Sequence, residues 1–212
     1  GIEQYTDELT SIAFDAYQKI DYKIDASDLA MVETTITLDR RLAGAERLAW
    51  ARELNAKRGD RRPENRPEVY AEQVLWFRDN PKEQLILQTI SIGDLAITAM
   101  PNEVYGITGL KLKAQSPFKT TFNMELANGA AGYIPPPEQH FLGGYTTWPA
   151  RTAGLETNAE PVIVDTLLGM LEKLSGRKRE PLATDFYNDQ QREAIRKARA
   201  EDNNRANRGL DR

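Results

Sequence analysis

Apolar and polar positions alternate with two different periods along the first half of the chain. Three early segments place apolar residues at helical spacing, and each predicts an amphipathic helix: residues 1–20, 40–57 and 68–78. Residues 29–38 are instead rich in β-branched side chains and predict a strand. A highly charged segment at 58–67 contains two prolines, and it predicts a loop.

The middle of the chain predicts a small sheet with a crossover helix. Two strand-like runs, 84–92 and 95–100, are separated by Gly93-Asp94, which is typical of a tight hairpin. A helix at 103–113 and a strand at 120–126 follow. The order strand, helix, strand predicts a βαβ unit with parallel strands and a right-handed crossover. We therefore expect a mixed α/β (α+β) fold in which flanking helices cover a mixed sheet.

The last third of the chain predicts a long loop, one more helix and a tail. Residues 128–158 are rich in glycine and proline and predict an irregular loop, whereas residues 159–174 have clear helical spacing. The tail at 176–212 has too few large apolar side chains to form a core, although 189–202 can form a charged helix. We expect residues 1–175 to be the body and 176–212 a charged tail that is partly helical or disordered.

Composition excludes several classes of function. The chain has no cysteine and a single histidine, His140, so thiol catalysis and zinc sites built from cysteines or paired histidines cannot be assembled from its own residues. Residues 1–175 hold 18 Lys and Arg against 25 Asp and Glu. Such an acidic body argues against a nucleic-acid partner, because phosphate contacts need clustered cations. No apolar run is long enough to predict a membrane span.

Candidate chemistry lies at one edge of the predicted sheet. The carboxyl ends of parallel strands meet at the same edge, where ligands collect. The two strands deliver Pro101-Asn102-Glu103 and the segment from Asn128 to Tyr133 to this edge. A carboxylate, an amide and a phenol should therefore converge. The simpler interpretation of Glu103 is a carboxylate that stabilises the first turn of a helix, and Tyr133 could be a half-buried core aromatic.

Three segments resemble the carboxy-terminal part of the catalytic domain of neutral/alkaline ceramidases, especially their short bacterial relatives. These segments are 92–113, 125–145 and 159–174, and the motifs are Pro101-Asn102-Glu103 and the run from Asn128 to Pro135. The resemblance implies a zinc amidohydrolase that cleaves the N-acyl amide bond of ceramide in sphingolipid metabolism. It also implies that Glu103 and Tyr133 are metal ligands, and that the protein is periplasmic or secreted.

The resemblance also implies that the zinc site is incomplete. In the family, two histidine ligands and a serine-containing catalytic segment lie in an amino-terminal half to which this chain has no counterpart, and His140 matches neither histidine motif. We expect the missing ligands to come from an upstream half of the same protein or from a partner chain. The substrate would be a lipid amide, bound by residues of the glycine- and proline-rich loop: Asn128, Gly144, Tyr145 and Trp148.

Two other functions remain open on the sequence. The same scaffold could be a non-catalytic remnant that serves as a lipid- or protein-binding module. Alternatively, the main role could belong to the basic tail, as a helix that docks on a partner. Two histidine motifs upstream in the gene would favour the enzyme, and a change in oligomeric state on deleting 177–212 would favour the docking helix.

Overall fold

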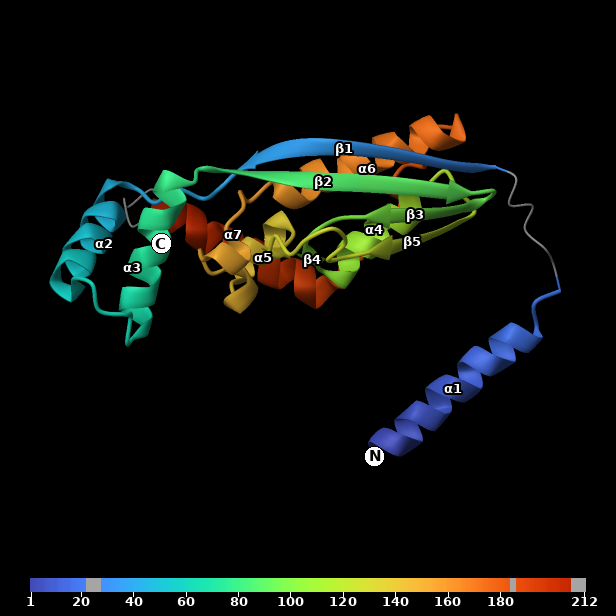
Figure 1. Cartoon of the computed structure of the whole chain (residues 1–212), viewed down its shortest axis with the longest axis horizontal. Coiled ribbons are helices and arrows are strands. Elements are labelled where there is room, and N and C mark those ends of the chain that lie inside the picture. The colour runs from blue at the N-terminus through green and yellow to red at the C-terminus, as the bar shows by residue number, and fades with distance from the viewer. Residues whose placement is uncertain (22–27, 184–185, 207–212) are drawn as a thin grey trace.

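The computed structural model describes residues 1–21, 28–183 and 186–206, and it shows a mixed α/β fold (Figure 1). The helices of this part of the chain are α1 (Ile2–Gln18), α2 (Ala45–Arg58), α3 (Arg66–Asp79), α4 (Gly106–Gln115), α5 (Pro137–Leu142), α6 (Ala159–Ser175) and α7 (Asp189–Ala206). The strands are β1 (Leu29–Asp39), β2 (Lys82–Ile92), β3 (Leu95–Ala99), β4 (Glu103–Val104), β5 (Thr120–Met124) and β6 (Tyr133–Ile134). The expected fold class is confirmed.

The main sheet has four strands in the order β1-β2-β3-β5. β1 and β2 pair antiparallel from Leu29 opposite Ile92 to Asp39 opposite Lys82, and β2 turns into β3 at Gly93. β3 and β5 pair in parallel, with α4 between them in the chain, so the predicted hairpin and βαβ unit are both confirmed.

The core lies on one face of this sheet. Alternate residues of β2, Leu85 and Leu87, are fully buried, because they pack into a cluster with leucines and isoleucines of α6 and α4. Leu112 of α4 and Leu167 of α6 belong to the same cluster. This packing fixes α4 against the sheet. It thereby sets where the chain leaves β3 and where it returns to β5.

The predicted helix at 103–113 begins three residues late. Glu103 and Val104 form strand β4 instead, which pairs in parallel with Tyr133 and Ile134 of β6. Glu103 is therefore not in the first turn of α4, which contains no acidic residue, and helix capping does not explain its position. Tertiary pairing, which sequence spacing does not report, decides the conformation of this segment.

Two other boundaries differ from expectation. The predicted loop at 128–158 contains β6, α5 and two 3₁₀ turns at Tyr145–Thr147 and Arg151–Ala153. The second helix starts at Ala45 rather than at residue 40, because Arg40 forms a β-bridge with Leu155.

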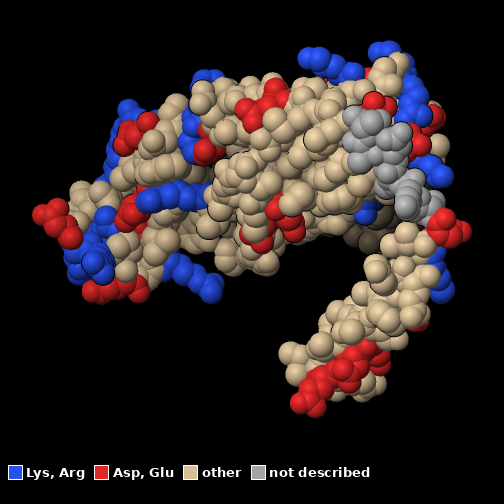
Figure 2. Space-filling view, turned by 45° about the vertical axis from the view of Figure 1, so that its right-hand side comes forward, with Lys and Arg blue, Asp and Glu red and all other residues tan. Residues whose placement is uncertain are grey.

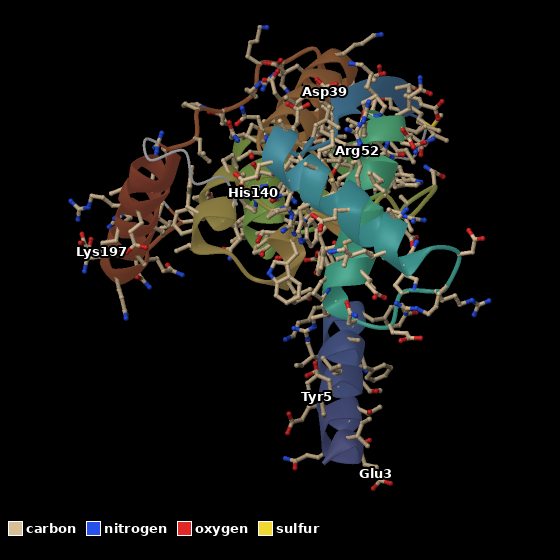
Figure 3. The ribbon with its side chains drawn as sticks, turned by 90° about the vertical axis from the view of Figure 1, so that its left-hand side faces the viewer. Glu3, Tyr5, Asp39, Arg52, His140 and Lys197 are labelled. Carbon is tan, nitrogen blue, oxygen red and sulfur yellow. The ribbon has the colours of Figure 1, made fainter. Side chains whose placement is uncertain are left out.

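Both terminal segments are helical. α1 lies apart from the sheet and buries none of its residues (Figure 1). α7 begins at the predicted Asp189 and lies beside α5, where the guanidinium of Arg199 is 5.8 Å from the ring centroid of Phe141 (Figure 3). In the described ranges, no helix combines the length and the apolar character that crossing a membrane requires.

Candidate functional site

Glu103 and Tyr133 are direct partners in the short parallel ladder of β4 and β6. The backbone N–H of Glu103 donates to the carbonyl of Gly132 at 3.1 Å, which fixes the register. Neighbouring strands lie about 4.8 Å apart, so the two side chains start from adjacent backbone positions. The carboxylate and the phenol that the sequence predicted at one sheet edge are thus brought together. Their role as metal ligands stays a prediction.

Asn102 holds the two strands of this ladder in place. Its side chain is fully buried, and its Nδ2 donates to the carbonyls of Ala131 and Gly132 at 3.1 and 3.3 Å. The backbone carbonyl of Asn102 accepts a hydrogen bond from the N–H of Leu126 at 3.2 Å. Asn102 therefore clamps the segment that leads into Tyr133. Nothing in the spacing of the sequence indicated this role.

The turn into Tyr133 depends on a glycine. Gly132 has φ of +79°, which side-chain-bearing residues rarely adopt, and a Cβ there would lie 2.6 Å from the carbonyl oxygen of Thr152. The 3₁₀ turn at Arg151–Ala153 thus packs closely against the backbone of Gly132, next to Tyr133.

Tyr145 is the other aromatic residue of the site. Its ring packs edge-on against Tyr133, with 5.4 Å between centroids, and it remains 64% exposed. The neighbouring Thr146 shares a 2.6 Å hydrogen bond with the hydroxyl of Tyr105, which ties this 3₁₀ turn to the chain between β4 and α4. Tyr145 therefore lies against Tyr133, and its expected role in binding a substrate stays a prediction.

The phenol of Tyr133 holds its proton firmly in this arrangement. A hydrogen bond with Tyr145, partial burial and the negative charge of Glu103 raise the pKa of Tyr133 to about 12. Both Glu103 and Tyr133 offer oxygen atoms, which zinc accepts as ligands. A cation placed between them would favour both the carboxylate and the phenolate. The donor set therefore fits half of a zinc site.

The other predicted binding residues are spread around this ladder. The amide of Asn128 donates to Gln88 of β2 at 2.7 Å, at an exposed position. Gly144 is exposed, with φ of +103° and open space where a Cβ would lie. Trp148 packs edge-on against Tyr70 of α3, 6.3 Å between centroids, so its indole is engaged with the α2–α3 end of the molecule. Their role in binding a substrate stays a prediction.

His140 is unsuited to complete the metal site. It lies in α5 rather than in a loop, half-buried, and its Nδ1 is 3.5 Å from a guanidinium nitrogen of Arg41 (Figure 3). Burial, and secondarily the charge of Arg41, lowers the pKa of His140 to about 4. The neighbouring cation disfavours a metal ion at this ring. Among the described residues there is no group of three or more His, Cys, Asp or Glu side chains that could hold a metal.

Comparison with solved structures shows that this is a ceramidase-like fold. The neutral ceramidase of Pseudomonas aeruginosa matches over 82% of this chain with a TM-score of 0.51 and 12% sequence identity. A second structure, described as a ceramidase complexed with C2, matches 50% of this chain and 17% of its own at 15% identity, with a TM-score of 0.40. No family model and no curated protein matches the sequence.

The likeness to the Pseudomonas enzyme confirms the expected resemblance at the level of the fold. This chain spans about a third of that enzyme's length, since the match covers 33% of it. The shared scaffold thus covers most of this chain, and two thirds of the larger protein has no counterpart in it.

Proposed function

We propose that this chain supplies two ligands, the Glu103 carboxylate and the Tyr133 phenolate, to the zinc site of an N-acyl amide hydrolase of the neutral ceramidase type. The observation that carries the proposal is the β4–β6 ladder, which places these two residues side by side. The ceramidase-like fold supports it. Two histidine ligands would come from a polypeptide portion outside this chain, either upstream in the same protein or in a partner.

Each residue of the site has a defined task in this proposal. A zinc ion bound there would lower the pKa of a water molecule toward about 7 and polarise an amide carbonyl. Glu103 and Tyr133 would orient toward the ion from adjacent strands, and Asn102 would keep those strands in register. The exposed ring of Tyr145 would offer apolar surface to a lipid chain, together with Asn128, Gly144 and Trp148 around the loop.

The half-site predicts weak metal binding by the chain alone. Two oxygen ligands lack the imidazole nitrogens that contribute most to zinc affinity at neutral pH. We expect calorimetry with ZnCl₂ to give a dissociation constant on the order of 0.1 mM or weaker, and no hydrolysis of ceramide. Glu103→Gln and Tyr133→Phe should each weaken binding at least tenfold, whereas His140→Gln should leave it unchanged.

Three results would count against this assignment. Zinc binding that survives both ligand substitutions would place the metal elsewhere. Tight stoichiometric zinc with full ceramide hydrolysis in the 212-residue chain would contradict the half-site. A longer polypeptide that hydrolyses ceramide equally well with Glu103→Gln would remove the catalytic role. In an active longer protein, Tyr145→Ala and Trp148→Ala should reduce turnover of long-chain amides more than that of short-chain amides.

A non-catalytic role on the same scaffold is the second candidate. Its basis is the shared fold, which supports a ceramidase-like scaffold whether or not the chain contributes to catalysis. A lipid- or protein-binding module would bind ceramide-containing vesicles without zinc, and Glu103→Gln would not weaken that binding.

A further inference from the structure

Within residues 1–21, 28–183 and 186–206, no helix packs on one face of the main sheet. We call the apolar residues that point away from α4 and α6 the outer face: Leu29, Met31, Ile86, Ile90, Ile92, Leu95, Ile97, Phe122 and Met124. Polar residues on the same side are Glu33, Thr35 and Gln88, of which Gln88 donates a hydrogen bond to Glu33. The strand register aligns Met31, Ile90, Ile97 and Phe122 in one row across all four strands. Leu29 is 68% exposed, Met31 57% and Phe122 40%. A sheet face in contact with water normally carries polar side chains, so this face is suited to being covered.

α1 has a matching uncovered surface. Ile2, Tyr5, Leu9 and Ile12 follow one another at helical spacing and are all exposed. The acidic side chains of the helix, which include Glu3 and Asp7, lie on other sides of it and are visible as the red patch in Figure 2. An isolated helix of this length is only marginally stable in water. Packing the apolar stripe of α1 against another apolar surface would stabilise the helix.

We propose that two copies of this chain form a dimer by exchanging α1, so that the apolar stripe of each α1 packs on the outer face of the other copy. The dimensions agree. A helix of 17 residues is about 25 Å long, and the outer-face residues of β2 from Ile86 to Ile92 extend about 20 Å. The sheet is about 14 Å wide over four strands, enough for one helix about 10 Å across.

The arrangement of the chain favours a second copy over the chain's own helix. α1 projects beyond the end of β1, clear of its own sheet (Figures 1 and 3). Each copy carries one helix and one open face, so a two-fold pairing covers both surfaces of both copies and closes the assembly.

The area is sufficient for a stable dimer. Half the surface of a cylinder about 25 Å long and 10 Å across is roughly 400 Å². Two helices, each burying its own stripe and an equal area of sheet, would bury about 1,600 Å², the size of a standard stable interface. The acidic residues of α1 would stay in water, and the carboxylate of Glu33 beside the outer face would keep the hydrogen bond that it accepts from Gln88.

The proposed interface leaves the candidate metal site open. Leu29, Ile92 and Leu95 lie at the amino end of β3, whereas Glu103 follows its carboxyl end. The two metal ligands are therefore outside the interface, although the proposed substrate-binding residue Asn128 donates to Gln88 on the same side of the sheet as the outer face. Zinc titration and light scattering test the two proposals separately.

Light scattering on the purified chain tests the dimer. We expect a dimer at micromolar concentration and a monomer after deletion of residues 1–20. Met31→Lys and Ile12→Lys should each weaken the contact between one α1 and one outer face about tenfold. The dimer contains two such contacts, so its dissociation constant should rise about a hundredfold. Ala30→Lys, which is exposed on β1 but has the opposite strand parity to Met31, and Thr10→Lys are matched controls outside the two apolar surfaces, and neither should change association. Circular dichroism verifies that every variant is folded.

Disulfide trapping tests the exchange itself, because the chain has no native cysteine. A Leu9→Cys chain and a size-tagged Met31→Cys chain are mixed and oxidised, and we expect the covalent heterodimer. Three outcomes would overturn the proposal: a monomer at every concentration, a Leu9→Cys homodimer without the heterodimer, or an intrachain disulfide as the main product of the double variant. The last would mean that α1 covers its own sheet.

Discussion

Replacing Gly132 with alanine should destabilise the protein and disturb the site together. The backbone of Gly132 has φ of +79°, and an added Cβ would lie 2.6 Å from the carbonyl oxygen of Thr152. That distance is well inside van der Waals contact, and the obstacle is backbone rather than a flexible side chain. The chain on one side of the contact must therefore move.

The structure provides the magnitude and a control. A positive φ costs an alanine about 1 to 2 kcal/mol, and overpacking against backbone adds about 2, so Gly132→Ala should lose about 3 to 4 kcal/mol of unfolding free energy. Gly176, which caps α6 with φ of +66°, has open space where its Cβ would lie. Gly176→Ala should lose only the conformational part, about 1 kcal/mol.

Urea unfolding measures this difference. With a slope of about 2 kcal/mol/M, the midpoint should fall by about 1.5 to 2 M for Gly132→Ala and about 0.5 M for Gly176→Ala. In ¹³C-labelled tyrosine spectra, assigned by comparison with Tyr133→Phe, the pKa of Tyr133 should drop from about 12 only in Gly132→Ala, because β6 moves away from Glu103 and Tyr145. Equal midpoint shifts in the two variants would refute the steric argument.

Three further predictions concern charged and titrating groups. Lys111→Met removes the ammonium that lies 3.1 Å from the carboxylate of Glu160, whose side chain is 2% exposed, so the free energy of unfolding should fall by about 3 kcal/mol. Lys113 is exposed, and Lys113→Met should change the free energy of unfolding by less than about 0.5 kcal/mol. Burial lowers the pKa of His140 to about 4, so as pH falls the unfolded chain binds this proton before the folded chain does. The free energy of unfolding should therefore decline by about 1 to 2 kcal/mol, after allowing for solvent screening, between about pH 6.5 and pH 4. The NMR titration of this single histidine reports the pKa directly, and a value near 6.5, or the same pH slope in His140→Gln, would contradict the reasoning. Tyr145→Phe removes the hydrogen bond that contributes most to the raised pKa of Tyr133, so that pKa should fall; an unchanged value would show that Glu103 and burial alone maintain it.

The sequence by itself determined the parts of this protein that depend on local spacing. Period-two alternation and Gly93-Asp94 predicted the hairpin, and the order of elements predicted the parallel pair β3 and β5. Because parallel strands share a carboxyl edge, topology alone was enough to bring the segments of Glu103 and Tyr133 together. The resemblance to ceramidases added the chemistry that topology cannot supply.

Only the tertiary structure decided how these segments are held. β4 and β6 are two residues long, too short for any period, and they form because Asn102 and Gly132 let two distant segments approach. The proximity of His140 to Arg41 and the contact of Trp148 with α3 are likewise long-range. The outer face also needed the fold, since β2 has apolar residues on both sides and only the packing of α6 shows which side is covered. Sequence spacing encodes the local conformation of a segment, whereas such pairings depend on which distant surfaces meet.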